Sequence, residues 1–162
     1  MNANAFRHFY NYHFAENRKV WSHVASLSYE QFTQAVDYSH GSVRDQILHL
    51  IDAEQMWFSE LRDVRPMEPL PSTDSDDRDT IRAYWDTAEQ NIRTYLAELR
   101  DDMLFTKPIK EPEEDQVLFV WQVLLHVANH ATDHRAQLLR VLHDLGVETK
   151  SQDYIFYIYD HL

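Results

Sequence analysis

The sequence predicts an all-α protein built as a four-helix bundle. Its 162 residues include only two glycines and five prolines, too few for a fold rich in strands and turns. Along four long segments, apolar side chains recur every three or four residues, the spacing that puts them on one face of a helix. At this length we expect one domain, residues 1–162, with enough chain to bury a core.

The first long helix is expected over residues 3–25, where aromatic and aliphatic side chains recur at helical spacing. A short helix should follow, because Ser28 and Gln31 have the spacing of a capping box. His40 and Gly41 are expected to end it, since glycine takes a positive φ without steric cost.

The second long helix is expected from Ser42 to about Arg62. Ser42 and Asp45 again have the spacing of a capping box. His49 is the one histidine of this helix, and it lies at the edge of the apolar face. Taken alone, His49 would be a weak functional signal.

Two long connectors separate the remaining helices. Residues 63–77 contain three prolines and no helical pattern, and they are long enough to cross the end of a bundle. The third long helix is expected to begin within residues 75–77 and to reach about Leu99. A second connector, residues 101–115, leads to the fourth helix.

The fourth long helix is expected from about Gln116 to Leu145, with Gly146 at the position where a left-handed glycine ends a helix. It is apolar on nearly all sides, and such a helix is buried on both of its faces. We therefore expect its second side to pack against another copy of the chain in a homodimer. That side contains Trp121, Leu125, Ala128 and Leu139. Residues 152–162, rich in tyrosine and isoleucine, should dock on the bundle as a short helix.

Three histidines fall four residues apart in the fourth helix, at His126, His130 and His134. Four residues advance a helix by about 40° around its axis and about 6 Å along it, so the rings share one stripe. Valine, alanine and leucine share that stripe, and the imidazoles are expected to face an apolar interior. Neutral imidazoles spaced in this way can share zinc, nickel or copper. Three in register favour a metal over hydrogen-bonded core histidines.

Composition excludes several classes of function. The absence of cysteine rules out disulfides, thiolate metal sites and cysteine nucleophiles. A formal charge of −12 argues against a nucleic-acid partner. No apolar run approaches the roughly 18 residues of a membrane span, and the N-terminus has no signal-peptide pattern, so we expect a cytoplasmic protein without a membrane partner.

Three groups of residues carry a known pattern. They are Tyr10-Asn11 with Asn17, then Gly41-Ser42-Val43-Arg44-Asp45 leading to His49, then Leu125-His126-Val127-Ala128-Asn129-His130 with His134-Arg135. Together they resemble the DinB/YfiT-like family of metal-dependent enzymes. The resemblance implies His49, His130 and His134 as the metal ligands. It also implies a four-helix bundle with a long crossover between helices 2 and 3, and often a homodimer. Many members have His-His-Arg-Gly-Gln where this chain has Asp133-His134-Arg135-Ala136-Gln137.

Two classes of function remain open at this point. Three histidine ligands leave room for water, which is typical of a catalytic site, and nickel or zinc suits such a set. The resemblance implies thiol-dependent S-transferases acting with low-molecular-weight thiols, and a hydrolase fits the same site. The alternative is a non-catalytic, metal-binding dimeric module.

The other chemical groups are interpreted more simply. His126 is interpreted as a core residue or a neighbour of the ligands. Asp52, one turn after His49, is interpreted as part of a solvated helix face in preference to a base or a group that orients a ligand. The remaining histidines are interpreted as surface or packing residues; they are His8, His13, His23, His40, His143 and His161. The zinc-protease, di-iron, phosphate-loop and serine-hydrolase motifs are all missing.

Overall fold

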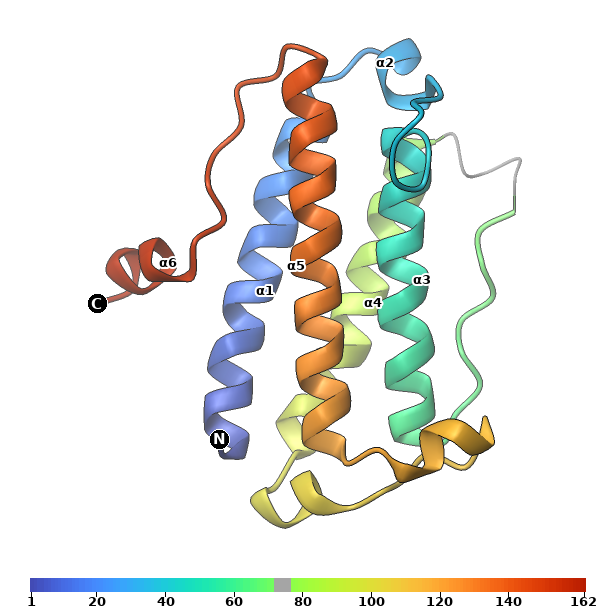
Figure 1. Ribbon diagram of the computed structural model, residues 1–162, viewed down its shortest axis with the longest axis vertical. Coiled ribbons are helices and arrows are strands. Elements are labelled where there is room, and N and C mark those ends of the chain that lie inside the picture. Colours follow the sequence, from blue (N-terminus) through green and yellow to red (C-terminus); the bar gives the residue numbers. More distant parts are fainter. Residues whose placement is uncertain (72–76) are drawn as a thin grey trace.

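A computed structural model describes residues 1–71 and 77–162. Its bundle consists of α1 (Ala3–Val24), α3 (Val43–Arg62), α4 (Arg78–Glu98) and α5 (Val120–Asp144). Helices α1 and α5 run in one direction and α3 and α4 in the other (Figure 1). Helix α3 packs against α4 and α5, and α1 packs against the same two helices. No strand occurs in the described ranges, so the predicted all-α bundle is confirmed.

The connection between α3 and α4 is the long crossover expected from the resemblance. The two helices run parallel, so the connecting chain must travel the length of the bundle, as Figure 1 shows. Residues 72–76 lie outside the described part, including the first two positions of the predicted helix start at residues 75–77. In the described part, α4 begins at Arg78, and the Asp77 side chain accepts hydrogen bonds from the backbone N–H groups of Asp79 and Thr80.

Local capping sets several helix ends. The two expected capping boxes are present, at Ser28 before α2 (Tyr29–Thr33) and at Ser42 before α3. After α5, Gly146 has a φ of +83°, as expected for a helix-ending glycine.

Two helix boundaries differ from expectation. Helix α2 ends at Thr33, well before His40, because Gln34 is extended with ψ of 131°. Helix α5 begins at Val120 rather than Gln116, because Leu118 is extended with ψ of 132° and follows the 3-10 turn η2 (Glu113–Val117). A second 3-10 turn, η1 (Asp101–Phe105), lies in the same connector.

The bundle interior contains two apolar clusters with a polar layer between them. One cluster includes Phe6, Phe58 and Leu124, and the other includes Val20, Ile47 and Leu138. Between these positions on α1, α3 and α5, six polar side chains are buried; they are His13, Glu16, Asn17, Glu54, Gln55 and Arg135. His13, Asn17, Glu54 and Arg135 contact one another and form the polar layer.

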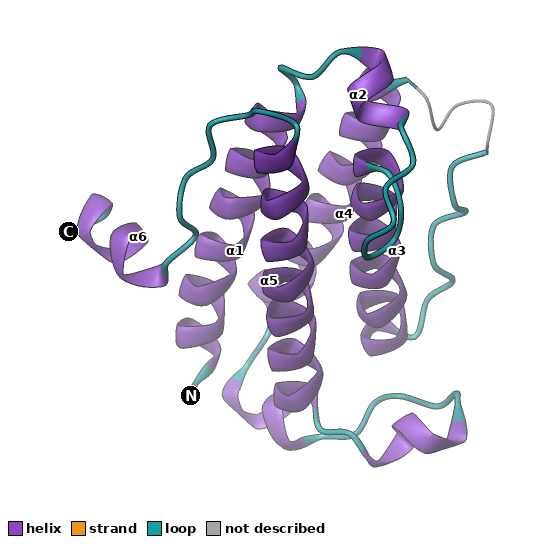
Figure 2. Cartoon of the chain, turned by 45° about the horizontal axis from the view of Figure 1, so that its top comes forward, coloured by secondary structure: helices purple, strands orange, loops and turns teal. Residues whose placement is uncertain are grey.

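The C-terminal helix α6 (Tyr154–Asp160) docks beside α1, as predicted, but with only part of its surface. Tyr154 and Tyr157 meet Tyr12 with ring centroids 5.1 and 5.6 Å apart. Ile155 and Phe156 remain exposed. Figure 2 shows α6 standing to one side of the four long helices. No described helix combines the length and the apolar character that crossing a membrane requires.

Candidate metal centre

His49, His130 and His134 come together between α3 and α5. The ring centroids of His130 and His134 are 4.3 Å apart, because these residues are one turn apart on α5. His49 lies 4.6 Å from His134 and 5.2 Å from His130, because α3 packs alongside α5. Two helices far apart in the sequence thus assemble the set that the resemblance implied.

A fourth histidine, His40, joins this cluster from the loop between α2 and α3. Its ring stacks on that of His49, with centroids 3.6 Å apart and an interplanar angle of 16°. It lies 5.0 Å from the His134 ring. One ligand nitrogen each from His40, His49 and His134 falls within 4.8 Å of the others. His40 is exposed, as the sequence suggested, but its place at the cluster was not foreseen, because no local pattern fixes the path of a loop.

The cluster lies at the edge of the bundle, which corrects the expected apolar interior. His49, His130 and His134 are half-buried, and His126 is exposed. The His126 ring meets Trp57 edge-on at 5.0 Å and lies 5.8 Å from His130. The stripe on α5 therefore points along the junction with α3 and not into the core.

The local environment favours the neutral form of His49, His130 and His134. Burial, followed by the nearby rings of His40, His134 and His130, lowers the pKa of His49 to about 4. The pKa values of His130 and His134 are also lowered, again chiefly by burial. Neutral imidazole is the form that binds metals.

Two nitrogen atoms of the cluster are buried without a hydrogen-bond partner. They are Nε2 of His49 and Nδ1 of His134. Buried polar atoms are seldom left in this state, and a metal ion would satisfy both. Metal–nitrogen bonds of about 2.0–2.1 Å bring neighbouring ligand atoms to roughly 3–3.5 Å. The ligand nitrogens of His40, His49 and His134 lie within 4.8 Å of one another, so small side-chain rotations would bring these three to metal-binding distance.

The polar layer lies directly beside this cluster. Arg135 is fully buried and donates from Nη1 to Asn17 Oδ1 at 2.8 Å and to His13 Nδ1 at 3.2 Å. The opposite nitrogen of His13, Nε2, lies 3.0 Å from Glu54 Oε1. Burial lowers the pKa of His13 despite the carboxylate of Glu54, so we assign a neutral ring that donates to Glu54 and accepts from Arg135.

No pattern in the sequence marks this layer as a unit. His13, interpreted from the sequence as a surface or packing residue, is a buried packing residue. Asn17 and Arg135 entered only through the resemblance, and Glu54 not at all. The one available signal was the four-residue spacing of His13 and Asn17 on α1.

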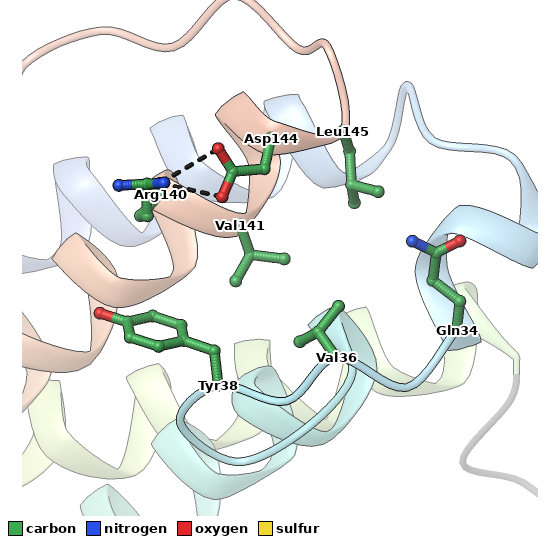
Figure 3. A pocket seen from close by; sticks show the side chains of 7 residues that line it. All are labelled: Gln34, Val36, Tyr38, Arg140, Val141, Asp144 and Leu145. Carbon is green, nitrogen blue, oxygen red and sulfur yellow. Dashed lines mark hydrogen bonds and ion pairs between the residues drawn. The ribbon is translucent and has the colours of Figure 1, made fainter.

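Two cavities lie along α5, and the walls of neither include His49, His130 or His134. One, of about 450 Å³, lies between the loop before α3 and the end of α5. In Figure 3, Tyr38 and Val36 face Val141 across it, and Arg140 pairs with Asp144. The other, of about 700 Å³, lies between α1, α5 and α6, and its walls include Trp121, His126 and Tyr154.

A comparison with known protein families identifies the family of this chain. The family description "DinB family" matches residues 1–161, nearly the whole length. The chain belongs to the DinB family. No curated protein sequence matches it. In this DinB bundle, the histidine cluster between α3 and α5 is compatible with metal binding, and His40 adds a fourth imidazole.

Proposed function

We propose that this protein is a metal-dependent enzyme that binds one divalent transition metal through His49, His130 and His134. The observation that carries this proposal is the convergence of three neutral imidazoles, two of which have a buried, unpartnered nitrogen. Membership in the DinB family supports the same conclusion. Nickel and zinc suit three imidazoles, and imidazole discriminates weakly between them.

A bound metal would lower the pKa of a coordinated water or thiol. This serves either thiol-dependent S-transfer or hydrolysis. The half-buried histidines leave the site open to a small substrate from the bundle edge. Asp52 lies on α3 and accepts a hydrogen bond from the Tyr84 hydroxyl at 2.9 Å, so it is held in place and does not move freely in solvent. A low-molecular-weight thiol as substrate would place the enzyme in the cytoplasm, where thiols stay reduced.

Elemental analysis tests the ligand set. His49→Ala, His130→Ala and His134→Ala are each expected to lower the metal content of the purified protein well below the wild-type stoichiometry. His143→Ala, an exposed histidine near the end of α5, is the matched control and should keep the wild-type content. If all three ligand variants retain metal in full, the assignment is wrong.

Activity is tested separately. The metal-loaded and chelator-treated proteins are compared on panels of thiol adducts, amides and esters. Turnover that requires metal and disappears in His134→Ala is the expected result. Metal-independent turnover, or none over a broad panel, counts against an enzyme.

A second candidate is a non-catalytic, metal-binding module whose bundle serves dimerisation. The exposed apolar residues Ile155 and Phe156 on α6 favour a further contact in this region. Stoichiometric metal without turnover on any panel would support this alternative.

A further inference from the structure

The loop between α2 and α3 carries His40 to the histidine cluster. In Figures 1 and 2 this loop doubles back along α3 before the helix begins. The His40 ring lies 3.6 Å from that of His49 and 5.0 Å from that of His134, so one loop residue contacts candidate ligands from both α3 and α5. His40 therefore lies against the cluster although it is exposed.

The loop is fixed on both sides of His40. The Ser39 hydroxyl donates to the side-chain oxygen of Gln137 on α5, one turn after His134. The Gln46 amide of α3 donates to the Gly41 carbonyl at 3.1 Å. Ser39 and Gly41 both have positive φ, 55° and 89°, and these two turns direct the chain at His40 toward the cluster. The position of His40 therefore follows from specific contacts.

The stacked rings of His40 and His49 show what must change when metal binds. A metal lies close to the plane of each imidazole that binds it. The rings of His40 and His49 are nearly parallel, with centroids 3.6 Å apart, so no single metal position lies in both ring planes. One of the two rings must therefore turn before both can bind the same metal. His40 is on an exposed loop, whereas His49 is half-buried within the 20-residue helix α3. His40 is therefore the ring that turns, and its ligand nitrogen already lies within 4.8 Å of those of His49 and His134.

We propose that His40 is a fourth imidazole ligand of the metal, supplied by the α2–α3 loop to the position that three helix-borne histidines leave open. The inference rests on the proposed function, because it adds to the set His49, His130 and His134. It makes the resting site a four-imidazole site, closed by a side chain that an incoming ligand must displace. The loop around His40 then controls access to the metal.

X-ray absorption spectroscopy of the zinc-loaded protein tests this proposal, because imidazole ligands can be counted from their scattering. Four imidazoles are expected in the wild type and three in His40→Ala, with zinc retained in both. Competition with a chelator should show affinity reduced by at least roughly 10-fold in His40→Ala, the lower bound for losing even an outer-shell partner. His143→Ala is the matched control and should match the wild type. The visible bands of the cobalt-loaded proteins provide an independent measure, since four-coordinate cobalt absorbs more strongly than cobalt with more ligands.

The possible results separate this proposal from the proposed function. If both wild type and His40→Ala show three imidazoles at zinc and bind zinc with equal affinity, His40 is not a ligand and the three-histidine site stands. A wild type that takes up no zinc overturns both. If His40→Ala loses zinc while His130→Ala keeps it, His40 is a ligand and His130 is not. Thermal melting of His40→Ala, expected at the wild-type temperature in metal-free buffer, shows that the variant is folded.

Discussion

Arg135 of α5 donates a hydrogen bond from Nη1 to the side-chain oxygen of Asn17 on α1, at 2.8 Å and fully inside the bundle. Its neighbour His134 belongs to the histidine cluster between α5 and α3. Successive residues on a helix point about 100° apart, so fixing Arg135 also fixes the direction of His134. The buried polar layer thus orients the helix that carries two candidate metal ligands.

Replacing Arg135 by methionine should strongly destabilise the fold. The substitution fills a similar volume but removes the buried cation that donates to His13 and Asn17, the two residues that contact the buried Glu54. Breaking a buried charge network by removing one partner costs about 3–5 kcal/mol. Urea unfolding of the metal-free protein measures this free energy. Arg140→Met, which removes only the exposed pair with Asp144, is the control and should leave the midpoint nearly unchanged. Equal midpoints for the two variants would contradict the role of the layer.

Metal retention should depend on pH. Protons compete with metal for imidazole nitrogen, so we expect metal to leave as the pH falls below roughly 6. Equilibrium dialysis of the loaded protein between neutral and acidic pH, followed by elemental analysis, measures the release. Full retention at acidic pH would point to ligands other than histidine.

The metal-free protein should lose stability on acidification. The pKa of His49 is about 4 in the folded protein against 6.5 for an unperturbed histidine, so the unfolded chain binds more protons between these values. The free energy of unfolding therefore falls as the pH drops from about 6.5 toward 4 and is unaffected by this group above that window. Melting temperatures of chelator-treated wild type and His49→Asn should converge at acidic pH. His143→Asn is the control and should follow the wild-type slope; an unchanged slope in His49→Asn would refute the prediction.

A homodimer is expected to involve the side of α5 around Leu125. Trp121 and Leu125 are only partly buried in the single chain, and both line the cavity between α1, α5 and α6. Light scattering should give twice the 19.4 kDa mass of the chain. Leu125→Asp should shift the protein toward the single-chain mass, whereas Val64→Asp, at an exposed site on the connector, should not. A wild type that scatters as 19.4 kDa at micromolar concentration would contradict the dimer.

Local sequence patterns are sufficient to predict the helices and part of the site. Helical spacing and the capping residues Ser28 and Ser42 predict where helices run, because hydrogen bonds within one turn are local. The pairing of His130 and His134 is equally local, since one helical turn brings the rings together. The resemblance, and not periodicity, added His49 and the crossover.

The positions of His40 and the polar layer depend on contacts between residues that are far apart in the sequence. The Ser39–Gln137 hydrogen bond that positions His40 joins residues 98 apart in the sequence, and the Arg135–Asn17 bond joins residues 118 apart. The half-buried state of the metal-site histidines likewise depends on the line along which α3 meets α5. Periodicity within a segment fixes which face is apolar, but the rotation of packed helices and the path of a loop follow from contacts between distant residues.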